Sequence, residues 1–90
     1  MVAVTERAKE RLLEMKLAAN ISEPEVGLRL KPAAGGEWGL VPDRALEGDQ
    51  VVEYDGSKVL LVGADASEAL GDRQVDCRET APGEMHLVLA

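Results

Sequence analysis

The segment Gln50–Val62 (QVVEYDGSKVLLV) constrains the fold of this chain more than any other stretch. Two apolar runs flank Asp55-Gly56, the dipeptide that favours a two-residue type I′ turn, because both central residues of that turn need positive φ. The segment therefore predicts an antiparallel β-hairpin. Its second strand is apolar on both faces, which is typical of a central strand.

The two-residue turn also predicts the pairing register of this hairpin. Counting outward from the turn places Val52 opposite Val59 and Glu53 opposite Lys58. We expect the second of these pairs to form a cross-strand ion pair, which would contribute roughly 0.2–1 kcal/mol.

Helices are predicted on both sides of the hairpin. Thr5 is a favourable N-cap for a helix over Thr5–Ala19, and apolar residues follow it at helical spacing. The predicted buried stripe of this helix consists of Ala8, Leu12, Met15 and Ala19. A shorter helix is predicted after the hairpin, with Asp65 as its N-cap and Gly71 at its end.

Alternating apolar residues predict further strands. Val26–Leu30 has the pattern of a half-buried strand with Arg29 on its exposed face. Glu37–Val41 is predicted to be a strand that ends at Pro42. A polar, solvated loop is expected over Asp43–Asp49.

A second hairpin is predicted near the end of the sequence, from Arg73–Thr80 and a last strand in which Met85 shares a face with Leu87 and Leu89. The order of elements is then helix, two strands, hairpin, short helix, hairpin. We predict a single domain over residues 1–90, of the α+β class, β-rich and mostly antiparallel, with an N-terminal helix and one short helix.

The charge of the chain excludes some classes of partner. Ten basic and seventeen acidic residues give a net charge of −7. Nucleic acids and anionic membranes both require a basic surface, so we expect neither as a partner. The sequence has no apolar signal-peptide stretch, no apolar run long enough to span a bilayer, and a single cysteine, which can form no internal disulfide. A cytoplasmic protein is therefore expected.

The order of these segments resembles the HesB/IscA-like family, the A-type iron–sulfur cluster carriers. The resemblance rests on a Val-Thr-Glu-Arg-Ala helix start, the strand Pro24–Leu30 (PEVGLRL), the glycine-rich segment Gly35–Gly39, the segment Glu47–Leu61 (EGDQVVEYDGSKVLL) and the strand that carries Val75-Asp76. It implies a compact HesB-like domain, a relation to iron–sulfur cluster assembly, and a chain that could form a homodimer.

The ligand cysteines that this resemblance implies are missing. Family carriers bind iron or a cluster through three cysteines, one in a Gly-Cys-x-Gly context and two in a Cys-x-Cys near the C-terminus. Here Glu37 stands at the first position, and no Cys-x-Cys occurs in the sequence up to Ala90. We therefore expect neither iron nor an iron–sulfur cluster as a cofactor, and we predict no catalytic residues.

Four residues remain as candidates for a site. Cys77, the single thiol, shares a predicted face with Val75 and is expected to be structural, with a ligand or redox role as the alternative. His86, the single histidine, is expected on the less buried face, with a metal or proton-transfer role as the alternative. Glu37 is a solvated loop residue or a hard ligand for a lone iron. Trp38 is expected to anchor the core or a dimer interface, with contact to a partner or to a ligand as the alternative.

Two functional hypotheses follow. The first is a HesB-like accessory module that contacts a protein partner in iron–sulfur metabolism without carrying a cluster. The alternative is an iron-binding protein whose site combines Glu37, His86 or Cys77 across a dimer. An enzyme is not expected, because one histidine and one cysteine without a cofactor motif supply little catalytic chemistry.

Overall fold

The computed structural model describes residues 2–90, apart from the side chains of Thr80, Glu84 and Met85. Within this range the elements are, in chain order, β1 (Ala3–Val4), α1 (Glu6–Ala18), β2 (Val26–Pro32), the 3₁₀ turn η1 (Ala34–Gly36), β3 (Trp38–Arg44), β4 (Gln50–Tyr54), β5 (Ser57–Val62), α2 (Ala64–Leu70), β6 (Gln74–Ala81) and β7 (Glu84–Leu89). The predicted face of Met85 falls outside the described side chains.

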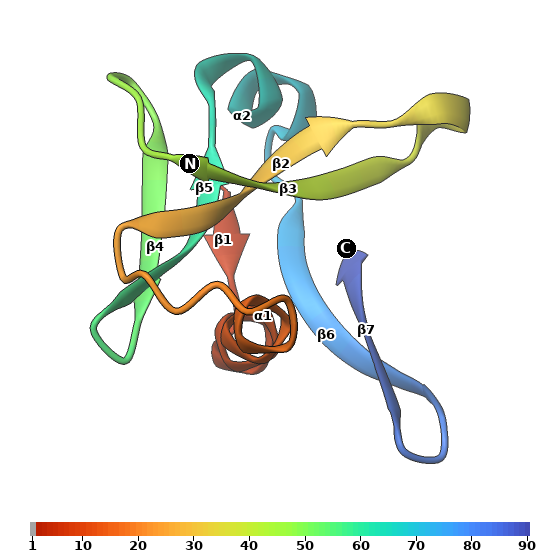
Figure 1. Ribbon diagram of the computed structural model, residues 1–90. Coiled ribbons are helices and arrows are strands. Elements are labelled where there is room, and N and C mark those ends of the chain that lie inside the picture. The colour runs from red at the N-terminus through yellow and green to blue at the C-terminus, as the bar shows by residue number, and fades with distance from the viewer. Residues whose placement is uncertain (1) are drawn as a thin grey trace.

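The strands form two small sheets (Figure 1). One has the order β3-β2-β5-β4 and the other the order β1-β6-β7. Neighbouring strands are antiparallel except in the pairs β2–β5 and β1–β6. Helix α1 packs against β4 and β5 of the first sheet and β6 of the second. This arrangement confirms the predicted strand-rich α+β fold, to which it adds the two-residue strand β1.

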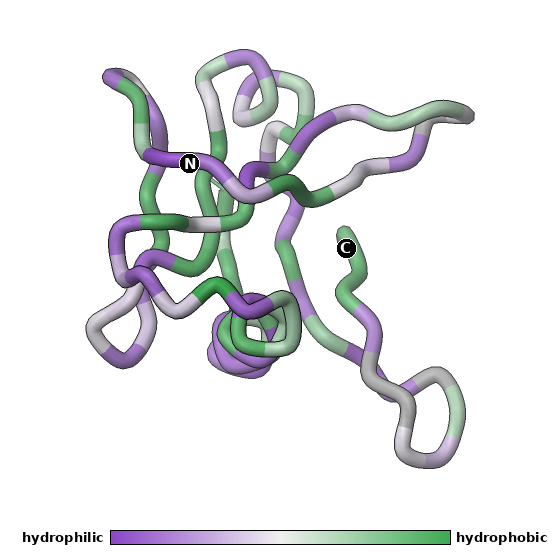
Figure 2. Tube along the Cα trace, viewed as in Figure 1, coloured by the Kyte–Doolittle hydropathy of each residue, from purple (hydrophilic) through white to green (hydrophobic). Residues whose placement is uncertain are grey.

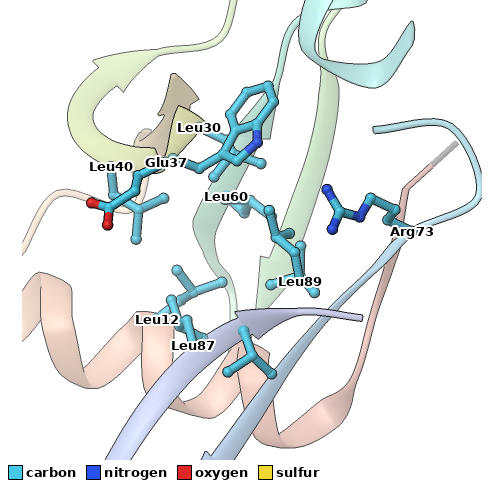
Figure 3. A pocket seen from close by; sticks show the side chains of 11 residues that line it. Leu12, Leu30, Glu37, Leu40, Leu60, Arg73, Leu87 and Leu89 are labelled. Carbon is cyan, nitrogen blue, oxygen red and sulfur yellow. The ribbon is translucent and has the colours of Figure 1, made fainter. Parts of the chain in front are cut away.

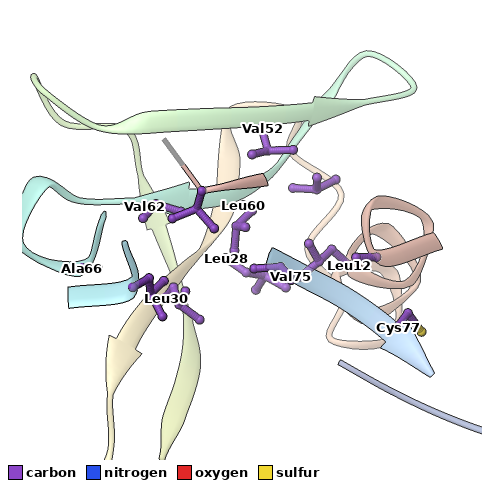
Figure 4. Packing of buried hydrophobic residues seen from close by; sticks show 13 residues of the cluster. Leu12, Leu28, Leu30, Val52, Leu60, Val62, Ala66, Val75 and Cys77 are labelled. Atoms are coloured by element: carbon purple, nitrogen blue, oxygen red, sulfur yellow. The ribbon is translucent and has the colours of Figure 1, made fainter. Parts of the chain in front are cut away.

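The buried core lies where α1 and the two sheets meet (Figure 4). Strand β5 contributes most to it through Val59, Leu60 and Val62, and its remaining leucine, Leu61, is also fully buried but lies outside this cluster. Its place between β2 and β4 confirms the prediction of a central strand. Figure 2 shows hydrophobic and hydrophilic residues alternating along α1, as expected for a helix with one buried face. No helix within residues 2–90 is long and apolar enough to cross a membrane.

The turn of the β4–β5 hairpin was predicted correctly, and so was the register next to the turn, but not the register beyond it. Asp55 and Gly56 have φ values of 53° and 76°, as a type I′ turn requires. Beyond the turn a β-bulge shifts the pairing, so that Val52 lies opposite Leu60 and not opposite Val59. The bulge inserts one unpaired residue into β5, which the length of the turn does not reveal.

The ion pair expected inside this hairpin is replaced by another. Glu53 does lie opposite Lys58 in the ladder. The Lys58 ammonium, however, donates to the carboxylate of Glu25, which precedes β2, at 2.8 Å. This hydrogen bond lowers the pKa of Glu25. The pair therefore links the hairpin turn to the start of β2.

Helix α1 begins as predicted but buries a residue that the pattern left out. The Thr5 hydroxyl caps the helix by accepting a hydrogen bond from the backbone N–H of Ala8, at 3.2 Å. Ala8 and Leu12 are fully buried, and the next fully buried position is Lys16, whereas Ala19 is exposed. The predicted stripe is therefore wrong at its C-terminal end.

Lys16 can be buried because its ammonium is fully hydrogen-bonded. Its Nζ donates to the backbone carbonyls of Glu23 at 3.2 Å and Lys58 at 2.7 Å, and to the Ser57 hydroxyl at 2.8 Å. These three acceptors match the three donors of an ammonium. Burial lowers the pKa of Lys16, because the charged form loses hydration. The contacts fix the last turn of α1 to the β4–β5 hairpin.

Strands β2 and β3 are longer than predicted. Pro42 lies inside β3, opposite Leu28 on β2, and does not end the strand. Since β3 is an edge strand, the missing N–H of proline removes no hydrogen bond that the sheet needs. Asp43 consequently belongs to β3 and not to a solvated loop.

Arg29 is buried, contrary to the prediction of an exposed position. Its Nε donates to a carboxylate oxygen of Asp43 at 2.7 Å, and its two terminal nitrogens donate to the two oxygens of Asp49 at 3.1 and 2.7 Å. One terminal nitrogen also donates to the carbonyl of Arg44 at 3.2 Å. These hydrogen bonds raise the pKa of Arg29 and lower the pKa values of both carboxylates.

Asp76 joins β6 to the start of α1. Its carboxylate accepts hydrogen bonds from the Thr5 hydroxyl at 2.7 Å, the Cys77 backbone N–H at 2.8 Å and the Arg7 guanidinium at 3.2 and 3.3 Å. The Thr5 hydroxyl contributes most to lowering the pKa of Asp76. The same hydroxyl that caps the helix therefore attaches it to the second sheet.

Helix α2 exists as predicted but begins differently. Its N-cap is Gly63, which offers no side-chain hydrogen bond, and Asp65 lies in the first turn and not at the cap. Gly71 ends the helix with a φ of 57°, which agrees with the prediction for this position.

We predict that Asp49→Asn destabilises the protein by about 3 kcal/mol, because it leaves the buried Arg29 charge without its bidentate partner. The side chains of Arg29 and Asp49 are only 9% and 5% exposed. Urea unfolding measures the change. Glu23→Gln is the matched control, since the Glu23–Arg44 pair is solvent-exposed and should contribute little. Equal effects of the two substitutions would contradict the prediction.

We also predict that acid destabilises the fold through its paired carboxylates. The pKa values of Asp43, Asp49 and Asp76 lie below the ordinary value of 3.8 in the folded chain. As the pH falls below about 5, the unfolded chain takes up these protons first, so stability decreases until the folded carboxylates are also protonated. The urea midpoint should fall between about pH 5 and pH 2. Asp76→Asn should flatten this slope, and a parallel slope would refute the contribution of Asp76.

Candidate functional site

A groove of about 330 Å³ lies between the two sheets and is the best candidate for a site. We call it the intersheet groove. Its walls come from α1, both sheets and the segments that flank them. The lining residues are Leu12, Leu30, Glu37, Trp38, Leu40, Leu60, Arg73, Val75, Leu87, Val88 and Leu89. All of them are apolar except Glu37 and Arg73, so the groove is an apolar hollow with two charged groups at its border (Figure 3).

One wall is the inner face of β2 and β3. Leu30 and Leu40 lie opposite each other in the ladder, so their side chains share a face of the sheet. Trp38 is two residues before Leu40 and therefore lies on the same face. Its side chain is half-buried.

The opposite wall is strand β7. Leu87, Val88 and Leu89 all line the groove, although consecutive residues of a strand point to opposite faces. Among the described strands, β7 pairs with β6 alone, so its other edge carries no neighbouring strand there. The groove therefore reaches around this free edge.

The two charged residues of the groove differ in direction. Figure 3 shows the Arg73 guanidinium directed toward Leu60 and Leu89, whereas the Glu37 carboxylate is directed away from them. Within the described part of the chain, no side chain or carbonyl accepts a hydrogen bond from the Arg73 guanidinium. Glu37 is exposed, which agrees with its expected place in a solvated segment.

Cys77 lies away from this groove. Its side chain is 1% exposed and belongs to the core with Val75. Cys77 itself lines a separate small hollow, together with four charged residues of α1, namely Arg7, Glu10, Arg11 and Glu14. The single thiol is therefore buried with Val75, as the strand pattern predicted, and it lies against α1.

His86 is exposed on β7, opposite Arg78 of β6. Among the residues that the structure describes, no group of three or more histidine, cysteine, aspartate or glutamate side chains is placed to hold a metal ion. Within one chain, Glu37, Cys77 and His86 thus do not combine with one another into a metal site.

Sequence reasoning identified Glu37 and Trp38 but missed most of the groove. Leu87 and Leu89 were recognised as one face of a strand, yet nothing local indicated that they would face Leu30 and Leu40 across the gap between two sheets. Arg73 was assigned only to a predicted strand, although it precedes β6. The available signal was the clustering of leucine at alternating positions on separate strands.

Comparison with solved structures identifies the fold. One similar structure is that of SufA from Escherichia coli, which is described as involved in the biosynthesis of iron–sulfur clusters. The match covers 99% of this chain and 83% of the SufA chain, at 22% sequence identity and with a TM-score of 0.64. A protein from Aquifex aeolicus matches 99% of this chain and 89% of its own at 24% identity, with a TM-score of 0.60.

A structure of IscA with the [2Fe–2S] cluster matches all of this chain and 81% of its own at 19% identity, with a TM-score of 0.57. No protein-family model and no curated protein matches the sequence. The fold is therefore the one seen in SufA and IscA, as the sequence resemblance implied.

We predict that the Cys77 thiol is protected in the folded protein, because only 1% of the residue is exposed. A disulfide reagent such as dithionitrobenzoate requires an accessible thiolate. It should react with one thiol per chain quickly in concentrated urea and only at the rate of structural opening in native buffer. Similar rates in both conditions would show that Cys77 is accessible and would reopen its role as a ligand.

Proposed function

We propose that this chain is a degenerate member of the HesB/IscA-like family, which contacts a protein partner in iron–sulfur metabolism and does not itself carry a cluster. The SufA and IscA folds support the relation to iron–sulfur carriers. The fold alone does not define an activity, since one scaffold often serves several functions. The side chains available to hold a cluster therefore decide the matter.

The burial of the single thiol carries this proposal. Iron–sulfur clusters are held mainly by cysteine thiolates, typically four. Cys77 is the single cysteine of the chain and lies beneath α1, and a symmetric dimer would supply only two copies of it. Glu37 stands where the family resemblance implies a cysteine, and a hard carboxylate is a poor ligand for a soft sulfide cluster. The residues present therefore do not fit the cluster.

The region around Trp38 is the proposed contact surface. Trp38 is the only tryptophan, it is half-buried at the intersheet groove, and tryptophan is enriched in protein interfaces. The net charge of −7 favours a partner with a basic surface, because complementary charge speeds association. A homodimer remains compatible with the same surface.

The alternative, an iron site shared by two copies of the chain, uses Glu37, His86 or Cys77. The buried position of Cys77 argues against its participation. Burial does not argue against Glu37 and His86, because both are exposed. Calorimetric titration with ferrous iron, repeated on Glu37→Ala and His86→Ala, distinguishes this alternative, because saturable heat that either substitution removes would support it.

Anaerobic reconstitution with ferrous iron and sulfide tests the main proposal. We predict no stable visible chromophore after desalting, whereas IscA, whose structure contains a [2Fe–2S] cluster, serves as the positive control when treated in the same way. Cys77→Ala is the matched variant, because any weak colour that it abolishes comes from the thiol. A stable chromophore at about one cluster per two chains would overturn the proposal.

A further inference from the structure

We propose that the intersheet groove binds a small amphipathic carboxylate, with its apolar chain among the leucines and its carboxylate on Arg73. This goes beyond the proposed function, since it assigns a ligand to a hollow and not a protein to a surface. The inference rests on the shape and lining of the groove and on the direction of one guanidinium.

The groove suits a short apolar chain. Its volume of about 330 Å³ lies at the lower end of the range for small-molecule pockets, which are mostly apolar with few polar groups. Six of the eleven lining residues are leucines, namely Leu12 of α1 and, from the two sheets, Leu30, Leu40, Leu60, Leu87 and Leu89. A slender acyl chain fits such a lining better than a bulky ring system would.

The charge of the ligand follows from Arg73. Its guanidinium is directed into the groove toward Leu60 and Leu89 (Figure 3), and no described residue accepts a hydrogen bond from it. A guanidinium presents paired N–H groups that match the two oxygens of a carboxylate. A cationic ligand would be repelled by Arg73, and a neutral one would leave it unused.

Glu37 supports the same orientation. Its carboxylate is directed away from the leucines, so it neither occupies the groove nor neutralises Arg73 from within it (Figure 3). Another anion beside Glu37 would be repelled, whereas one beside Arg73 would be attracted. The carboxylate group of the ligand is therefore expected at the Arg73 side.

The intrinsic fluorescence of Trp38 measures binding directly, because it is the single tryptophan and lines the groove. Titration with octanoate should give a saturable change. Hexanoate should bind about fifteenfold more weakly, since each buried methylene strengthens binding about fourfold. 1-Octanol should bind more weakly than octanoate, because it cannot form the ion pair.

Arg73→Gln should weaken octanoate binding about tenfold and leave 1-octanol binding unchanged, since only the charged hydrogen bonds are lost. Arg78→Gln is the matched control, because Arg78 is exposed on β6 and does not line the groove. Circular dichroism confirms that both variants are folded. Binding to octanoate and 1-octanol should be unaffected by the control substitution.

Three outcomes would overturn the proposal. The first is a fluorescence change that does not saturate, and the second is equal binding of octanoate to the native chain and Arg73→Gln. The third is that, without ligand, Trp38 becomes more buried as the protein concentration rises and sedimentation equilibrium detects a dimer. That result would identify a second copy of the chain as the occupant of the groove. None of these outcomes affects cluster reconstitution, so the two proposals fail separately.

Discussion

The bidentate ion pair between Arg29 and Asp49 is the interaction on which the first sheet depends. Both side chains are almost fully buried, so each requires the other to offset its lost hydration. The pair attaches β2 to the loop before β4, and the contact of Arg29 with Asp43 attaches β2 to β3 as well. Leu30, the next residue of β2, points to the opposite face and lines the groove. The buried ion pairs of Arg29 therefore stabilise β2 on one face, while Leu30 on the other face of this strand lines the candidate site.

The sequence allowed prediction of features that depend on near neighbours. The Asp55-Gly56 turn and the Thr5 cap follow from local conformational preferences, so both were predicted correctly. The burial of Lys16 and Arg29 was not predicted, because their acceptors are supplied by segments up to 42 and 20 residues away. Local pattern assigns a charged residue to solvent unless distant partners are known. Pro42 was misjudged for a similar reason, since only the sheet order makes β3 an edge.

The candidate site was less predictable than the fold. Resemblance to a carrier family drew attention to Glu37 and Trp38, and both do border the groove. The groove itself arises from the packing of two sheets that share no strand, which no periodicity describes. Arg73 is a candidate binding residue only because the fold places its guanidinium beside the leucines of the groove. The fold is the one seen in SufA and IscA, and the residues of the groove support the carboxylate ligand that we propose.

The pairing of β1 with β6 brings the two ends of the molecule together, and this has a consequence for how the chain folds. Thr5 and Asp76, which join these ends, are 71 residues apart in sequence. Closing a flexible loop of that length costs roughly 4 kcal/mol of chain entropy beyond a constant term. Contacts of such separation form late and slow the search for the native topology. The second sheet therefore cannot form until β6 and β7 have been synthesised, long after β1.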